Sequence, residues 1–135
     1  MARLCTLASG SSGNATYIST NDGDILIDAG VSCKALTKAI GVANGDISRL
    51  KAVAITHPHT DHICGLKTFL KTTKIPLIAS NDTLQTLANN DIIPEGIKTI
   101  IADSGIITLG DIQLDFFATS HDAKGSGGYV VTLPD

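Results

Sequence analysis

The chain has 135 residues, of which 43% are hydrophobic and 17% charged, and this composition fits one globular domain and excludes a disordered or fibrous chain. Thirteen acidic against ten basic residues leave a net charge of −3, so no chain-wide attraction draws the protein to nucleic acid. No apolar run reaches the roughly 18–20 residues that a membrane helix needs, and no secretion signal follows Met1, so we expect a soluble, cytoplasmic protein without a membrane partner.

The first part of the chain predicts three strands joined by hairpins. Short apolar stretches cover residues 4–8, 14–19 and 24–28. The segments between them, Ser9–Gly13 and Asn21–Gly23, are rich in turn-forming residues, which is typical of tight connections between antiparallel strands. We therefore expect these consecutive strands to pair with one another.

Helices and strands alternate after this point. Ser32 is the expected N-cap of a helix that ends at Gly41, and Asn81 or Asp82 can cap a later helix. Further strands are expected at residues 50–56, 76–79, 112–118 and 129–133, a hairpin at 105–111, and another helix at 66–70. Strands interleaved with helices indicate an α/β layered sandwich, whose sheet is mixed because its opening strands are hairpins.

A histidine-rich motif, H-x-H-x-D-H, occupies residues 57–62. His57 and His59 are two residues apart at the end of a strand-like run, so their rings point to the same side. The chain then turns toward a helix, which brings Asp61 and His62 around the same cavity. Imidazole and carboxylate ligands suit Zn(II), Mn(II) or Fe(II), and a cluster this dense can hold two ions about 3.5–4 Å apart. The motif predicts a metal site, and the alternative is a set of histidines on a solvated loop.

Two residues outside the motif are further candidates. His121 follows the strand expected at 112–118, and this position, like that of His57, favours a metal ligand over an ordinary surface histidine. Asp28 ends the third expected strand, just before Ala29 and Gly30. It is either a simple turn residue or a carboxylate that orients a ligand imidazole through its other ring nitrogen.

The order of these motifs resembles the metallo-β-lactamase superfamily of hydrolases: an early Asp-x-Gly at 28–30, H-x-H-x-D-H followed by Gly65, and a lone histidine after a strand. The strings at 9–14 and 120–123 are similar to the YycJ/WalJ-like branch, which consists of bacterial exonucleases. The resemblance implies an αβ/βα sandwich made of two similar halves. Residues 1–135 would then be a single, truncated domain that contains the N-terminal half and a further strand or two, with a mixed sheet and flanking helices.

The resemblance also implies a site for two divalent ions, Zn(II) or Mn(II). By position, the first ion is held by His57, His59 and His121, and the second by Asp61 and His62. Asp28 would orient the ligands, and Asp61 would also be catalytic, holding or accepting a proton from the attacking water. Complete members add a bridging aspartate and a final histidine downstream, and this chain has no fifth histidine. The dinuclear site is therefore expected to be incomplete within these residues.

The resemblance favours phosphodiester hydrolysis at nucleic-acid ends, like a 5′-to-3′ DNA exonuclease that uses a metal-activated water. Nucleic acid would be the substrate, and Ser11, Ser12 and Asn14 would contact a phosphate, unless their loop is a plain turn. One alternative is a thioester or lactam hydrolase of the glyoxalase II or lactamase type on the same fold. Another is an inactive fragment that self-associates through an exposed sheet edge.

Overall fold

The computed structural model describes residues 2–119 and 124–134. Its strands are β1 (Arg3–Ala8), β2 (Ala15–Ser19), β3 (Asp24–Ile27), β4 (Leu50–Ala54), β5 (Leu77–Ala79), β6 (Thr99–Ile101), β7 (Ile107–Leu109), β8 (Ile112–Ala118) and β9 (Gly127–Thr132). Its α-helices are α1 (Cys33–Val42), α2 (Thr60–Ile63), α3 (Leu66–Thr73) and α4 (Asn81–Asn89), and its 3-10 helices are η1 (Ile47–Arg49) and η2 (Ala102–Ser104).

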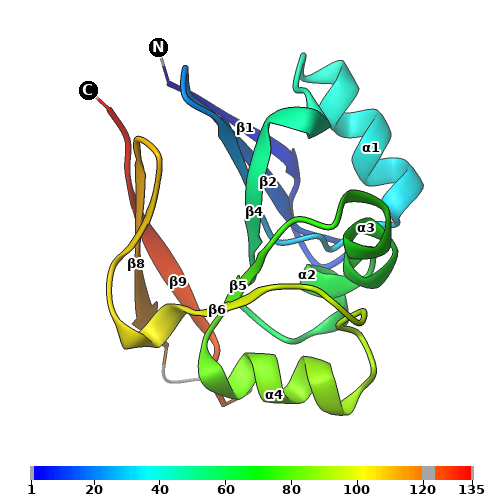
Figure 1. The fold of residues 1–135 in the computed structure, drawn as a ribbon. Helices are drawn as coiled ribbons and strands as arrows, with labels where there is room; N and C mark the ends of the chain where they lie inside the picture. The colour runs from blue at the N-terminus through cyan, green and yellow to red at the C-terminus, as the bar shows by residue number, and fades with distance from the viewer. Residues whose placement is uncertain (1, 120–123, 135) are drawn as a thin grey trace.

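These elements form two sheets that face each other, with helices on the far side of the first sheet (Figure 1). The first sheet has the strand order β1-β2-β3-β4-β5-β6, and the second has the order β7-β8-β9. Helices α1 and α3 cover the first sheet on the side away from β8 and β9 (Figure 1). The predicted α/β sandwich with a mixed sheet and flanking helices is confirmed.

Strand direction decides which residues meet at the edge of the first sheet. Strands β1, β2 and β3 pair antiparallel, as the hairpins predict, and β3, β4, β5 and β6 pair parallel. The carboxyl ends of β3, β4 and β5 therefore lie together, at the end of the sheet that we call the carboxyl edge. Strand β2 begins at this carboxyl edge, because it runs antiparallel to β3. Ligand sites of α/β sheets are typically found at this carboxyl edge.

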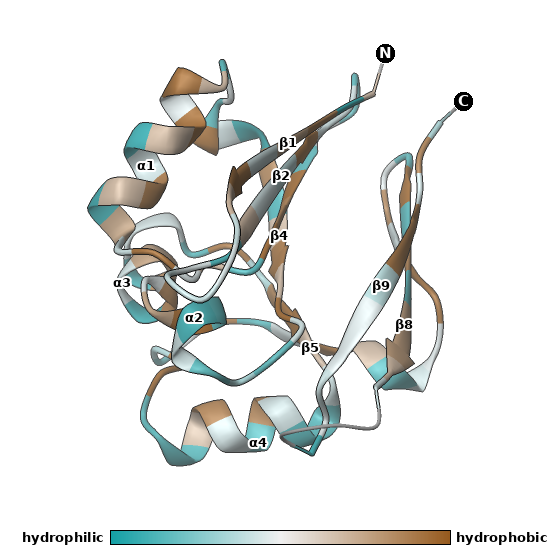
Figure 2. Cartoon of the chain, turned by 180° about the vertical axis from the view of Figure 1, so that it is seen from behind, coloured by the Kyte–Doolittle hydropathy of each residue, from teal (hydrophilic) through white to brown (hydrophobic). Residues whose placement is uncertain are grey.

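Two hydrophobic cores hold the layers together, and they use alternate residues of the same strands. Leu26 and Val53 face the helices, where they join a core with Leu36 and Phe69. The residues that alternate with them along the same strands face the second sheet. They belong to a second core, which contains Ile18, Ile25, Ala52, Ala54, Ile78, Ala102, Ile112 and Leu114. Figure 2 shows hydrophobic strands in both sheets and a mainly hydrophilic α2 at one end. The period of two residues explains how one sheet serves both cores.

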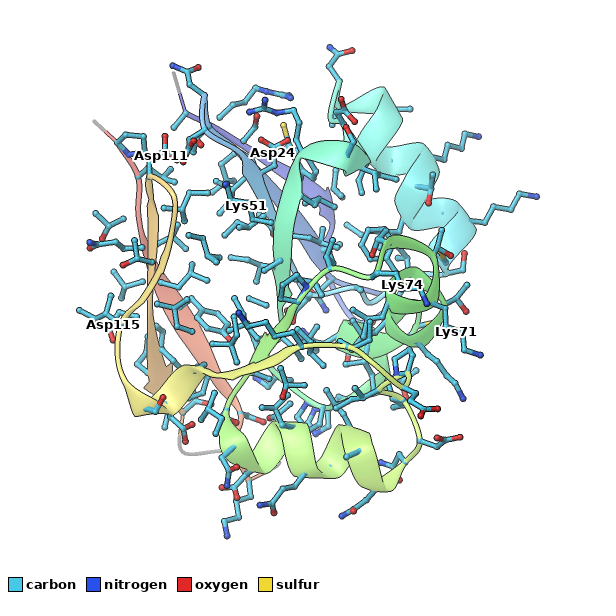
Figure 3. The ribbon with its side chains drawn as sticks, viewed as in Figure 1. Asp24, Lys51, Lys71, Lys74, Asp111 and Asp115 are labelled. Atoms are coloured by element: carbon cyan, nitrogen blue, oxygen red, sulfur yellow. The ribbon has the colours of Figure 1, made fainter. Side chains whose placement is uncertain are left out.

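A buried carboxylate fixes the opposite end of the first sheet. Asp24 begins β3 with 1% of its surface exposed, accepts a hydrogen bond from the Tyr17 hydroxyl, and lies 3.4 Å from Nε of Arg49. Figure 3 shows Asp24 close to the start of β4, well away from the carboxyl edge. Burial, with the hydrogen bond to Asp24, raises the pKa of Tyr17 to about 12. The phenol therefore stays protonated near neutral pH and can donate its hydrogen bond to the carboxylate of Asp24.

Some expected element boundaries are wrong. Ser80, and neither Asn81 nor Asp82, caps α4, because its hydroxyl accepts a hydrogen bond from the backbone N–H of Thr83 at 3.2 Å. Helix α1 continues through Gly41 to Val42. Strand β6 was not expected, since three residues are too few to show a hydrophobic period.

The edge strands leave one prediction open. Strands β1 and β6 end the first sheet, and β7 and β9 end the second, within the described residues. Leu4 on β1 and Val130 on β9 are 59% and 57% exposed, and unpaired apolar edges favour pairing with another chain. Self-association through such an edge stays a prediction. In the described part of the chain, no helix has the length and apolar character needed to cross a membrane.

Candidate metal centre

Asp28 joins the ends of β3 and β4. It follows β3 with a φ of 64°, a left-handed conformation that Asp tolerates better than most residues. Its backbone N–H donates to the carbonyl of Ala54 at 2.8 Å, and its Oδ1 accepts from the backbone N–H of Thr56 at 2.8 Å. Only 5% of Asp28 is exposed, so this carboxylate is a buried acceptor at the carboxyl edge.

Thr56 connects this carboxylate to the first histidine of the motif. Its hydroxyl lies 2.7 Å from Oδ2 of Asp28 and 2.7 Å from Nδ1 of His57. An ionised carboxylate can only accept, so the single hydroxyl proton goes to Asp28, and Nδ1–H of His57 donates to the hydroxyl oxygen. In a neutral His57 ring that donates from Nδ1, the lone pair is on Nε2, and this is one of the two forms in which imidazole binds metals.

His62 reaches the same carboxylate. Its Nδ1 lies 2.7 Å from Oδ2 of Asp28, so Nδ1–H donates to the carboxylate, and in the neutral ring the lone pair is on Nε2. Asp28 thus holds one histidine directly and the other through Thr56. Thr56 was not predicted, because its role depends on a contact with Asp28, 28 residues earlier, that forms only when β3 pairs with β4.

The structure brings four predicted residues together at the carboxyl edge. The ring centroid of His57 lies 6.0 Å from that of His59 and 4.5 Å from that of His62. Oδ2 of Asp61 lies 3.7 Å from Nε2 of His62. Asp61 and His62 belong to the short helix α2, for which His59 is the N-cap. Three imidazoles and a carboxylate therefore share a region a few ångströms wide.

The remaining predicted residues have different positions. Asn14 lies beside Asp61, and its backbone N–H donates to the Asp61 carbonyl at 2.8 Å. Ser11 and Ser12 are exposed in the connection between β1 and β2. His121 lies outside the described residues. The chain returns to the carboxyl edge at Gly127, whose N–H donates to the carbonyl of Thr56 at 2.9 Å.

The donor set suits a divalent ion. Among residues 2–119 and 124–134, no three His, Cys, Asp or Glu side chains already meet as a metal cluster. The donors nevertheless have the right chemistry, because His57 and His62 are held as Nδ1–H tautomers and a carboxylate accompanies them. Imidazole with carboxylate is a usual ligand set for Zn(II) and Mn(II). The chemistry of the donor set therefore fits a divalent ion.

The interaction with Asp28 changes the acidity of His62. The hydrogen bond to Asp28 raises the pKa of His62 above its ordinary value of 6.5, burial opposes this effect, and the charges of Asp28 and Asp61 reinforce it. A raised folded-state pKa means that the pair adds stability that is fully present below pH 6.5 and is lost as the pH rises through the folded value. Protonation of His62 also competes with metal binding as the pH falls.

Nuclear magnetic resonance of the metal-free chain tests this effect. We expect the His62 ring to titrate above pH 6.5, and we expect Asp28→Asn to move its pKa back toward that value because the charged partner is lost. Lys71→Ala, an exposed change on α3, serves as the control and should leave the titration unchanged. A wild-type His62 that titrates at or below 6.5 would contradict the proposed interaction.

Gly30 allows the segments of the site to approach one another. A Cβ at this position would lie 1.8 Å from the Asp61 carbonyl oxygen and 2.5 Å from the Asn14 nitrogen. We expect Gly30→Ala to lower the free energy of unfolding by about 3 kcal/mol, because backbone on two sides must move. Gly41→Ala is the matched control, since nothing lies within 4 Å of its added Cβ on α1, and it should stabilise by about 0.5–1 kcal/mol. Urea denaturation of both variants measures the difference.

Comparison with known proteins identifies the family. Residues 8–135 match the family described as the metallo-beta-lactamase superfamily. The chain is 37% identical over 120 residues to the exodeoxyribonuclease YycJ of Bacillus anthracis, and the alignment covers 87% of this chain and 45% of that protein. The exodeoxyribonuclease WalJ of Streptococcus pneumoniae serotype 2 matches with the same identity and coverage. The solved structure of the Rm3 metallo-beta-lactamase matches with a TM-score of 0.82 at 22% identity, covering 98% of this chain and 54% of that one.

These similarities define the architecture as the metallo-β-lactamase fold, with one mixed sheet between helices and a second sheet. The chain belongs to the metallo-β-lactamase superfamily, and the resemblance found in its sequence, including that to YycJ and WalJ, is confirmed. The expectation of a member of this hydrolase superfamily is likewise confirmed. The chain spans about half the length of these two exodeoxyribonucleases, 45% in each case.

Proposed function

We propose that this chain provides the metal-binding edge of a phosphodiesterase that removes nucleotides from DNA ends, in the manner of a 5′-to-3′ exonuclease. The observation that carries the proposal is the network in which Asp28 and Thr56 hold His57 and His62 with Nε2 as the lone-pair nitrogen. The relatives at 37% identity are named exodeoxyribonucleases, which favours DNA as the substrate. Activity is proposed for the whole protein, because the relatives are about twice as long as this chain.

The proposed ligands follow the positions at the carboxyl edge. For the first ion they are His57, His59 and His121, and for the second they are Asp61 and His62. The rings of His57 and His59 are 6.0 Å apart between centroids, and Asp61 lies beside His62, so the two described groups are adjacent. Zn(II) and Mn(II) are the proposed ions, since both accept imidazole and carboxylate ligands.

The chemistry needs an activated water and a neutralised phosphate. When bound, divalent ions make water acidic enough to attack near neutral pH and offset the charge of the scissile phosphate. Asp61, whose side chain is 35% exposed, holds or accepts a proton of that water. The carboxylate of Asp28 accepts hydrogen bonds from Thr56 and His62. Its proposed role is therefore to orient the ligands, and contact with the substrate is not part of it.

The connection between β1 and β2 is the proposed phosphate-binding loop. Gly10 and Gly13 have φ values of 108° and 149°, which let the loop turn tightly beside the edge strand. Ser11 and Ser12 between them are exposed and can offer hydroxyl and backbone N–H groups to an anion. Asn14 begins the return into β2 and contacts Asp61, so the loop is attached directly to the metal centre.

Parallel assays test the proposed reaction class. The whole protein is incubated with Mn(II) or Zn(II) and 5′-phosphorylated DNA, a lactoylglutathione-type thioester, or a chromogenic lactam, with His57→Ala as the matched control. We expect nucleotide release from DNA that His57→Ala abolishes. Turnover of the thioester or lactam alone would overturn the nuclease proposal in favour of the other hydrolase types. A lack of all three activities in the whole protein would also overturn the proposal, whereas activity of the whole protein without activity of residues 1–135 alone would support it and identify these residues as an inactive fragment with an incomplete site.

A further inference from the structure

We propose that Asn14 is a positioning residue for the carboxylate of Asp61, and this inference rests on the proposed function. Asp61 and His62 are the proposed ligands of the second ion. Asn14 lies 47 residues away in the sequence, at the start of β2, yet it contacts both the backbone and the side chain of Asp61. Its role would be to hold the carboxylate oxygen next to His62 so that both can reach the same ion.

The contacts account for every hydrogen of the Asn14 amide. Nδ2 lies 2.9 Å from the Gly10 carbonyl, 3.2 Å from the Asp61 carbonyl and 3.4 Å from Oδ2 of Asp61. One hydrogen points to Gly10, and the other is shared between the two oxygens of Asp61, because an amide nitrogen carries only two hydrogens. The oxygen Oδ1 of Asn14 accepts from the N–H of Gly10 at 3.2 Å. The orientation of the amide is therefore determined by its partners.

The same carboxylate oxygen also faces the histidine. Oδ2 of Asp61 lies 3.7 Å from Nε2 of His62 and 3.4 Å from Nδ2 of Asn14. The Asn14 amide can therefore donate to the same carboxylate oxygen that lies beside His62. A donor that holds a ligating carboxylate in this way fixes its rotamer and tunes its affinity for the metal.

The backbone around Asn14 is rigid enough to support this role. The N–H of Asn14 donates to the Asp61 carbonyl at 2.8 Å, and its own carbonyl accepts from the N–H of Gly30 at 2.9 Å. The N–H of Ala29 donates to the carbonyl of His62 at 2.8 Å. The start of β2, the exit from β3 and helix α2 are thus joined by main-chain bonds that remain when only the Asn14 side chain is changed.

A purely structural role for the side chain is the competing explanation. The two contacts with Gly10 close the loop and would exist even if Asp61 were elsewhere. Asn14→Asp keeps the oxygen that accepts from the N–H of Gly10 but loses the donor to the Gly10 carbonyl and to Asp61, so it removes the Asp61 contact while one of the two loop contacts remains. It also brings a negative charge toward Asp61. Asn14→Ala removes both roles, and Asn89→Ala, an exposed change on α4, is the matched control.

The first measurement uses the metal-free full chain. Three-bond Hα–Hβ couplings of Asp61 report whether its side chain occupies one rotamer. We expect wild type and Asn89→Ala to show the couplings of one rotamer, and Asn14→Asp and Asn14→Ala to show averaged values while remaining folded. Unchanged Asp61 couplings in the folded Asn14→Asp variant would overturn the inference. This result does not depend on metal or on nuclease activity, so it stays distinct from a failure of the proposed function.

The second measurement is a chelator competition with Zn(II) on the same proteins. We expect Asn14→Asp and Asn14→Ala to lower the affinity for the less tightly held ion by about tenfold. This is the lower end of the usual loss of metal affinity when a residue that orients a ligand is changed. The more tightly held ion should be unaffected, because His57 and His59 do not contact Asn14 in the described structure. Equal affinities in wild type and both variants would contradict the inference.

Discussion

Replacing His57 by Ala is expected to reduce the metal content of the purified chain by one equivalent, and His59→Ala should do the same. Both side chains are proposed ligands of the first ion, and their rings lie 6.0 Å apart between centroids. Loss of one imidazole removes one of the proposed nitrogen donors to this ion. The metal content is measured by elemental analysis after dialysis against a fixed concentration of Zn(II).

Two comparisons make this result specific. Lys71→Ala changes an exposed side chain of α3 that points away from the first sheet (Figure 3), so its metal content should equal that of wild type. Circular dichroism of each variant establishes that the chain is folded. Unchanged stoichiometry in both His57→Ala and His59→Ala would refute the ligand assignment.

Removing the buried carboxylate is expected to have the largest effect on stability. Asp28→Ala should lower the free energy of unfolding of the metal-free chain by about 3 kcal/mol or more, since buried donors lose their charged acceptor. Those donors are the backbone N–H and hydroxyl of Thr56 and Nδ1–H of His62. The backbone bond from Asp28 N–H to the Ala54 carbonyl remains in this variant, so the effect is that of the side chain alone. Urea denaturation without metal gives the value.

The control is another aspartate in a different environment. Asp115 is exposed on the outward face of the second sheet (Figure 3), and Asp115→Ala should change the stability by no more than about 0.5 kcal/mol. Thr56→Val gives an intermediate case, because it keeps the shape of the side chain and the backbone bond but removes the hydroxyl between Asp28 and His57. Equal stabilities for the Asp28 and Asp115 variants would show that the buried network contributes nothing.

The metal motif could be predicted because its information is local. His57, His59, Asp61 and His62 lie within six residues, and the end of a strand followed by a helical turn is enough to bring them together. The family resemblance added an order of motifs, which the match over residues 8–135 confirmed. The role of each ligand stays a prediction, and His121 lies outside the described residues.

The supporting residues could not be predicted because their partners are far away in the sequence. The expectation that Asn14 binds substrate stays a prediction, and its amide contacts Gly10 and Asp61, the latter only because β2 begins beside the exit of β3. Thr56 is similar, because its importance depends on Asp28, which lies 28 residues earlier. These assignments depend on the register of the sheet.

The N-cap of α4 could not be predicted from the local sequence either. Ser80, Asn81 and Asp82 are all good N-cap residues by type. Ser80 is the cap because its hydroxyl also donates to the carbonyl of Gly125 at 2.7 Å, a partner 45 residues away. Likewise, Lys67, Lys71 and Lys74 have helical spacing, but α3 ends at Thr73 and Lys74 is left-handed, with a φ of 61°.

The central claim is that the carboxyl edge of the first sheet holds divalent metal, and anomalous diffraction from crystals grown with Zn(II) tests it most directly. We predict an anomalous peak about 2.1 Å from ring nitrogens of His57 and His59, the usual Zn–N distance. A second peak is predicted beside Asp61 and His62, about 3.5–4 Å from the first. Zinc bound only elsewhere on the chain, with none at His57 and His59, would contradict the account.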